Sequence, residues 1–121
     1  MASTKVVTAI WSSQTLTAGA GDTTSSDINL IDGYGGSLHV KLTNGATGPT
    51  VAAQVQVQYS GDDSEYYGYG GPLTGNTDSS GVSSWTIPVP IGAQYLRLVA
   101  GSNTAQNVTV DADVTEVTAL T

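Results

Sequence analysis

The sequence predicts an all-β fold, an antiparallel β-sandwich of about eight strands with a jelly-roll-like arrangement. Apolar and polar residues alternate with the period of a half-buried strand in most segments of the chain. Turn-forming dipeptides separate these segments at short intervals, as they do in sandwiches and barrels. Apolar stripes with a helical period are absent. We therefore expect residues 1–121 to form a single domain without helices.

The expected strands follow from this alternation and from the turn residues between them. Residues 1–4 precede the first strand as a short N-terminal arm. Gly19–Asp22, Asp32-Gly33 and Gly35-Gly36 supply turns in the first third of the chain. The strands are predicted at Lys5–Trp11, Gln14–Ala18, Asp27–Ile31, Ser37–Thr43, Val51–Tyr59, Val82–Val89, Gln94–Ala100 and Asn107–Leu120.

Two of these segments alternate most clearly, Ser37–Thr43 and Val51–Tyr59. The dipeptide Asn44-Gly45 that follows the first of them is typical of a hairpin turn. We therefore expect the two strands to be antiparallel neighbours in the middle of a sheet. The residues expected to face the core are Leu38, Val40 and Leu42 in the first strand and Val51, Ala53, Val55, Val57 and Tyr59 in the second.

The last predicted strand, residues 107–120, changes phase near its end. Inward positions alternate regularly as far as Val114, after which Val117 rather than Glu116 is expected to face the core. This change predicts a β-bulge or a strand that passes from one sheet to the other.

Residues 61–81 form the long exception to the strand pattern. The segment is rich in glycine and tyrosine and contains Asp62, Asp63 and Glu65. Loops of this length without secondary structure are uncommon in compact domains and are usually functional or mobile. We therefore expect a long Gly/Tyr-rich loop over residues 61–81.

The charge and composition of the chain exclude several classes of function. Ten Asp and Glu residues stand against three Lys and Arg, so the net charge is −7 and a basic face for nucleic acid is absent. No apolar run approaches the ~20 residues of a membrane-spanning helix. The N-terminus lacks the pattern of a signal peptide, and the sequence contains no cysteine. We expect neither nucleic acid nor membrane as a partner, and synthesis in the cytoplasm.

Candidate catalytic and metal-ligating residues are few. The single histidine, His39, lies on the polar side of its strand, where a surface or interface role is more common than catalysis. The serines lack the Gly-x-Ser-x-Gly context of a nucleophile elbow. Asp62, Asp63 and Glu65 form either a solvated loop or a weak cation site, and they match no EF-hand spacing. We therefore expect no enzymatic activity, no cofactor and no metal centre.

Tyr66, Tyr67 and Tyr69 are the local feature most typical of a binding site. Tyrosine offers a large contact area at small entropic cost and keeps a polar hydroxyl group, so binding loops favour it. Contact with a partner subunit or another protein is the role we expect. Two alternatives remain open, in which the loop folds back over an end of the sandwich or the rings stack on a glycan.

Several stretches of the chain together are similar to one protein family. They are the start Met1–Thr4, the stretch Trp85–Pro90, and the segments Gln94–Val99 and Asn107–Ala112, within a composition rich in Ala, Gly and Thr and free of cysteine. With these features the chain resembles the small decoration, or cement, proteins of tailed-bacteriophage heads. The resemblance extends over most of the chain and includes no catalytic signature.

The resemblance implies a structural virion protein, made in the host cytoplasm and located on the outer surface of the capsid. Such proteins bind the major capsid protein at junctions between capsid subunits, reinforce those junctions and are typically homotrimers. The alternative is another virion or surface binding module, from a tail, a fibre or a carbohydrate-binding β-sandwich. Glycan binding is possible in that reading but is not favoured.

Further candidate contact residues lie on predicted strands rather than in the loop. They are Tyr95 and the row Gln54, Gln56 and Gln58. Since Lys5, Lys41 and Arg97 are the only lysines and arginines, three acidic copies repel one another, and contacts between them must be apolar or neutral polar. A glutamine row can form hydrogen bonds across an interface without the desolvation cost of ions.

Overall fold

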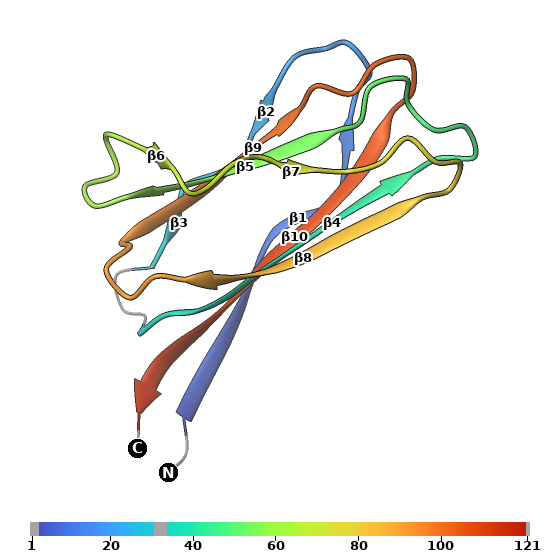
Figure 1. Ribbon diagram of the computed structural model, residues 1–121. Helices are drawn as coiled ribbons and strands as arrows, with labels where there is room; N and C mark the ends of the chain where they lie inside the picture. The colour runs from blue at the N-terminus through green and yellow to red at the C-terminus, as the bar shows by residue number, and fades with distance from the viewer. Residues whose placement is uncertain (1–2, 31–33, 121) are drawn as a thin grey trace.

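The computed structural model describes residues 3–30 and 34–120 and is all-β over both ranges, which confirms the predicted fold class (Figure 1). Its strands pair antiparallel throughout. None of the described segments is a helix long and apolar enough to span a membrane. The strands are β1 (Ser3–Leu16), β2 (Thr23–Thr24), β3 (Ile28–Asn29), β4 (Gly36–Asn44), β5 (Gln54–Ser60), β6 (Tyr67–Gly68), β7 (Leu73–Thr74), β8 (Val82–Val89), β9 (Tyr95–Gly101) and β10 (Val108–Leu120).

Two sheets share these strands. Sheet A has the order β1-β10-β4-β8, and sheet B has the order β2-β9-β5-β6, with β3 also paired to β9 and β7 to β5. Because β2 and β3 share one edge of sheet B, and β6 and β7 share the other, the ten strands occupy eight positions. When the eight positions are numbered along the chain, the first pairs with the last, the second with the seventh, the third with the sixth and the fourth with the fifth. This nesting of antiparallel pairs is jelly-roll-like.

The core lies between the inner faces of the two sheets. Apolar side chains alternate inward along β4, β5, β9 and β10, as the sequence pattern predicted, while the residues between them face outward. Partly buried Trp85 and Ile87 on β8 pack against the same cluster. Its fully buried members include Leu16, Leu38, Leu42, Val55, Val57, Leu96, Leu98, Val108, Val110 and Val114.

The expected pairing of Ser37–Thr43 with Val51–Tyr59 is wrong. These segments belong to β4 and β5, and β4 has β10 and β8 as its neighbours in sheet A, whereas β5 pairs with β9 in sheet B. Asn44-Gly45 therefore starts a connection between sheets rather than a hairpin. The side chain of Asn44 donates hydrogen bonds to the Asn76 carbonyl at 3.0 Å, the Asn76 Oδ1 at 2.8 Å and the Asp78 carbonyl at 3.0 Å. These bonds tie the end of β4 to the segment before β8.

The predicted strands at 5–11 and 14–18 are one continuous strand, β1, interrupted by bulges. Its register with β10 shifts between Ala9 and Trp11 and again between Trp11 and Gln14, and Ser13 has a φ of 52°. The short strand β2 was not predicted. Residues 1–2 of the expected N-terminal arm lie outside the described residues, and Ser3 and Thr4 already pair with β10.

The expected phase change at the end of β10 occurs later than the sequence indicated. Glu116 keeps the inward phase and is buried. The register of this end of β10 with β1 does not shift until the interval between Val117 and Ala119. The strand stays in sheet A. Hydrophobicity alone predicts that Val117 faces the core here, but Glu116 does so instead.

Residues 61–81 are more ordered than a long loop. They fold back along β5, where β6 and β7 form short pairings at the edge of sheet B. Backbone hydrogen bonds extend this edge, from the Tyr69 N–H to the Val57 carbonyl at 2.8 Å and from the Gly75 N–H to the Ala53 carbonyl at 2.9 Å. Leu73 packs against the core. The backbone of this segment thus extends the edge of sheet B beside β5.

Candidate functional site

The three tyrosines of the predicted contact loop point to two different faces of sheet B. Tyr66 lies on the outer face, where the Arg97 guanidinium carbon is 4.0 Å from the centre of its ring. Tyr67 is paired with Tyr59, whose side chain faces the core, so Tyr67 projects to the inner side. Tyr69 projects to that side as well, since its ring contacts the Tyr59 ring. The candidate residues therefore form two sites rather than one.

The outer face of sheet B gathers the other predicted contact residues. Gln54, Gln56 and Gln58 project outward from β5, and Tyr95 projects outward from β9 beside them. The glutamines form hydrogen bonds within the chain: Gln56 Nε2 donates to the Val57 carbonyl at 2.9 Å, and Gln58 Oε1 accepts from Arg97 Nε at 2.7 Å. They hold the sheet and its folded-back edge together, and whether they also contact a partner stays a prediction.

A small charged cluster lies at one end of this outer face. The Tyr66 hydroxyl donates to Asp63 Oδ1 at 2.5 Å. A side-chain hydrogen bond to Asp63 raises the pKa of Asp27 above its ordinary value, and slight desolvation of this exposed carboxyl adds to the effect. Burial, followed by the hydrogen bond to Asp63, raises the pKa of Tyr66. The cluster joins the segment before β3 to the tip of residues 61–66.

Asp62 forms hydrogen bonds with the backbone of its own turn. The N–H groups of Ser64 and Glu65 donate to its Oδ1 at 2.9 and 3.1 Å, and these bonds hold the pKa of Asp62 below its ordinary value. No group of three or more His, Asp or Glu side chains within residues 3–30 and 34–120 is arranged to hold a metal ion. Asp62 thus closes the turn at residues 62–65, while Asp63 and Glu65 accept hydrogen bonds from the Tyr66 and Tyr67 hydroxyls.

The shared hydrogen bond between Asp27 and Asp63 gives a measurable titration. We expect the Asp27 carboxyl to titrate above the ordinary aspartate value in carbon-detected NMR, and Asp63→Ala to move that pKa back down. Because the folded-state pKa lies above the unfolded one, the pair stabilises the fold below the unfolded pKa, and this contribution is lost as the pH rises through the folded pKa. Asp113→Ala, on the opposite sheet, is the control. An unchanged Asp27 pKa in Asp63→Ala would contradict the pairing.

The inner site is a recess of about 280 Å³ between the edge of sheet B and the β8–β9 connection. We call it the aromatic recess. It is lined by Tyr59, Ser60, Gly61, Tyr67, Gly68, Tyr69, Pro90, Gly92 and Ala93. Tyr67 and Tyr69 are exposed, and glycines 61 and 92 have open space where a Cβ would stand. The rings therefore present accessible surface at the mouth of the recess.

Tyr59 is the buried member of the aromatic recess. Its ring meets that of Tyr69 edge to face, with the centroids 5.2 Å apart and the planes at 80°. Its hydroxyl oxygen is buried and has no hydrogen-bond partner among the described residues. Burial, and then the proximity of Tyr69, raises the pKa of Tyr59 to about 12. A buried hydroxyl without a partner is costly, and such a group in a native fold calls for an explanation.

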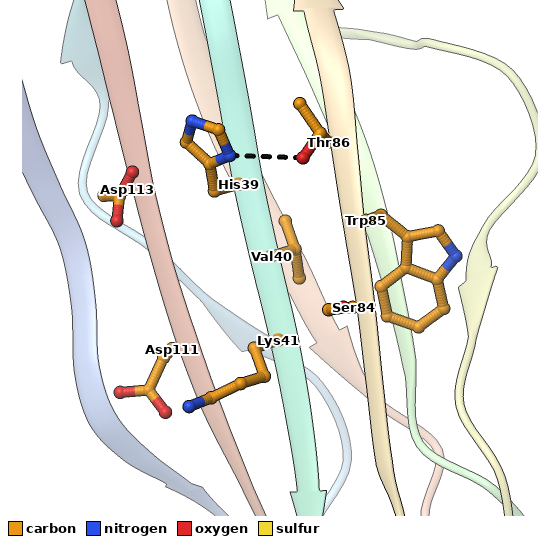
Figure 2. Close-up of a pocket in the computed structure, with 8 residues that line it drawn as sticks. All are labelled: His39, Val40, Lys41, Ser84, Trp85, Thr86, Asp111 and Asp113. Atoms are coloured by element: carbon orange, nitrogen blue, oxygen red, sulfur yellow. Dashed lines mark hydrogen bonds between the residues drawn. The ribbon is translucent and has the colours of Figure 1, made fainter.

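A third feature, which the sequence interpretation missed, is a depression of about 290 Å³ on the outer face of sheet A (Figure 2). Register places Asp111, Lys41 and Ser84 in one row across β10, β4 and β8, and Asp113, His39 and Thr86 in the next. His39 Nδ1 lies 3.3 Å from Thr86 Oγ1. Strand alternation alone predicts that each of these six side chains faces outward. That they lie side by side depends on the pairing of β10, β4 and β8, which the sequence pattern does not show.

The row Asp113–His39–Thr86 has the residue types of a hydrolytic triad without its geometry. A triad needs an acid bonded to one ring nitrogen and a nucleophile bonded to the other. Among the described residues the only hydrogen bond of His39 is the long one to Thr86. Asp111, the neighbouring carboxylate, accepts a bond from the Ser13 N–H at 2.8 Å and closes the bulge of β1. The depression is a polar surface rather than an assembled catalytic centre.

No protein-family model matches the chain, and no curated protein sequence matches it. Solved structures do match, at low identity. The SPBc2 prophage-derived protein YomS has a TM-score of 0.55 at 13% identity, with 96% of each chain covered. The VP2 subviral particle of infectious bursal disease virus has a TM-score of 0.58 at 10% identity, covering 93% of this chain and 32% of that one.

A further match is an adhesin domain. The K3 cleaved adhesin domain of Lys-gingipain from Porphyromonas gingivalis has a TM-score of 0.56 at 14% identity, covering 92% of this chain and 72% of that one. At such identities the likeness shows the fold alone, because one β-sandwich architecture carries many functions. The chain is thus similar in fold to a prophage protein, a viral particle protein and an adhesin domain.

Proposed function

We propose that this chain is a structural virion protein that decorates and reinforces the outside of a tailed-phage capsid. In this proposal it binds the major capsid protein at junctions between capsid subunits and acts as a homotrimer. The fold is compatible with a virion component, since a prophage-derived protein and a viral particle protein share it. The sequence resemblance points to the same class.

The observation that carries the proposal is an apolar surface at one end of the sandwich. Figure 1 shows β1 and β10 extending past the other strands at the end where both termini lie. Val7 on β1, level with the start of β4, is 65% exposed, and Val6, which projects from the opposite face of the same strand, is 44% exposed. Tyr34 joins them, since its N–H donates to the Val117 carbonyl at 2.7 Å. We call Val6, Val7, Tyr34 and the neighbouring Ile91 the terminal patch.

The terminal patch has the features of a docking surface. Large exposed apolar side chains gathered at one place mark interaction sites more often than scattered ones do. The outer edge of β1 has no neighbouring strand in sheet A, so it also offers backbone groups for pairing with another chain. The rest of the molecule is acidic, which discourages unspecific association and directs binding to this end.

Cosedimentation with phage heads tests the proposal. The wild-type chain is expected to bind assembled heads of the phage that encodes it and not the dissociated major capsid protein. Val7→Asp places a charge in the docking surface and is expected to weaken binding about tenfold or more. Val82→Asp, at a valine of similar exposure on β8, is the matched control. Equal binding by both variants, or no binding by the wild type, would overturn the docking role of this patch.

The trimer is tested separately by light scattering. Because the three copies are each acidic and contacts between them are apolar or neutral polar in this proposal, added salt should strengthen the trimer or leave it intact. A monomer at both low and high ionic strength would remove the trimer from the proposal. Dissociation by salt would show instead that ion pairs hold the copies together.

A further inference from the structure

The aromatic recess is independent of capsid docking, because none of its lining residues belongs to the terminal patch. Its volume of about 280 Å³ is at the lower end of the range of small-ligand pockets, which suits a single ring rather than an extended molecule. Two of its walls are the exposed rings of Tyr67 and Tyr69. Pro90, Gly92 and Ala93 form the wall across from them.

Contacts within the chain restrict the two exposed rings before any ligand arrives. The Tyr67 hydroxyl donates to Glu65 Oε2 at 2.7 Å. Tyr69 is held by its backbone bond to Val57 and by the edge-to-face contact with Tyr59. Rings held in this way lose little entropy on binding, so an apolar ligand face can stack on them at low cost.

The polar groups of the recess point to a neutral ligand rich in hydroxyl groups. The buried Tyr59 hydroxyl has an unused donor and acceptor, whereas the buried Ser60 hydroxyl already donates to Asp62 Oδ1 at 3.1 Å. The residues that line the recess include no lysine or arginine, so an anionic ligand would gain no counter-charge. An extended peptide is also a poor fit, because the adjacent strand β6 is only two residues long.

We propose that the aromatic recess binds one pyranose residue of a neutral glycan. The apolar C–H face of the sugar stacks on the exposed rings of Tyr67 and Tyr69, and one sugar hydroxyl bonds to the Tyr59 hydroxyl oxygen, which is buried in the free protein and becomes accessible as the sugar displaces the Tyr69 ring. A pyranose combines these two surfaces, an apolar face and a hydroxyl-bearing edge, in a ring of suitable size. The site would allow the chain to attach to a glycan-coated surface as well as to its own assembly.

NMR titration of the isolated protein tests the proposal. The probes are the methyl pyranosides of glucose, galactose, mannose and N-acetylglucosamine, each added to the isotope-labelled chain. At least one is expected to cause saturable shifts at the amides of Tyr67, Tyr69 and Gly92. Tyr67→Ala is expected to weaken that binding about tenfold. Tyr95→Ala, on the outer face of the same sheet, is the matched control and should bind as the wild type does.

Tyr59→Phe gives the sharpest variant because it removes only the hydroxyl oxygen. In the free protein that oxygen has no partner among the described residues, so the melting temperature should stay the same or rise. Sugar affinity should nevertheless fall about three- to tenfold, the value of one neutral hydrogen bond. If the Tyr59 hydroxyl had only a structural role, Tyr59→Phe would lower the melting temperature instead. An unchanged sugar affinity would show that the hydroxyl does not contact the ligand and would overturn the proposed pose.

Three other outcomes would overturn the sugar site. They are the absence of saturable shifts with all four pyranosides, shifts that map to the depression on sheet A, and binding of tetramethylammonium in place of the sugars. The last would indicate an aromatic cage for cations. Failure of sugar binding does not affect the capsid proposal, because Val7→Asp is expected to lose binding to heads while keeping its sugar affinity.

Discussion

Replacement of Val55 by aspartate is expected to leave little soluble folded protein. Val55 is 0% exposed near the start of β5, and its side chain lies in the core between the two sheets. A carboxylate there has no partner, and its burial costs several kcal/mol out of a typical total stability of about 5–15 kcal/mol. The yield of soluble protein and its urea midpoint are the measurements.

Val51→Asp is the matched control for this variant. The sequence pattern places Val51 and Val55 on the same inward face, but the structure begins β5 at Gln54 and leaves Val51 50% exposed. The exposed substitution is expected to change the free energy of unfolding by no more than about 0.5 kcal/mol. Equal losses at the two positions would mean that the strand begins earlier than it does here. A tolerated Val55→Asp would show that β5 has the opposite phase.

The accuracy of the sequence interpretation depends on the range of the interactions that decide each feature. Alternation is local, so it placed Val40, Val57 and Leu98 correctly in the core. Pairing between strands is not local. Asn44-Gly45 has the composition of a hairpin turn, yet both neighbours of β4 are strands from the C-terminal half of the chain. A turn dipeptide cannot indicate that β8 and β10 will occupy the places beside β4.

The tyrosines show how far a local rule could have been taken. Strand alternation alone puts Tyr67 and Tyr69 on one side and Tyr66 on the other, and the structure has this arrangement. Extending the strand pattern into residues 61–81 would therefore have separated the two sites. The contact of Tyr59 with Tyr69 was beyond such a rule, because it requires β6 to pair with β5.

Buried polar residues mark the limit of hydrophobic patterning. Glu116 and Asn103 are both buried, although composition alone assigns such residues to the surface. Asn103 lies in the connection between β9 and β10, and its side-chain N–H groups donate to the Leu16 carbonyl and to the Gln106 carbonyl, each at 2.9 Å. The first of these bonds joins residues 87 positions apart in the chain. No local signal in the sequence could have predicted that bond.

These bonds make Asn103 the second position where a single change should have a large effect. It is 2% exposed, and its backbone carbonyl also accepts a bond from the Gly19 N–H at 3.0 Å. Asn103→Asp replaces the amide donor by an oxygen, so a buried carboxylate faces two carbonyl oxygens. The expected loss is on the order of 3–5 kcal/mol at neutral pH, because a hydrogen-bonded polar group becomes an unpaired charge.

Gln106→Glu adds the same charge at an exposed side chain in the same connection and is the control, with an expected change within about 0.5 kcal/mol. Burial raises the pKa of the introduced carboxyl at position 103, so its penalty appears as the pH rises through that pKa. Below that pH the protonated carboxyl can donate one hydrogen bond. The difference in unfolding free energy between Asn103→Asp and Gln106→Glu, measured by urea denaturation, should therefore become smaller. A difference in unfolding free energy between the two variants that is the same at acid and neutral pH would show that the lost amide donor, rather than the buried charge, sets the cost at this position.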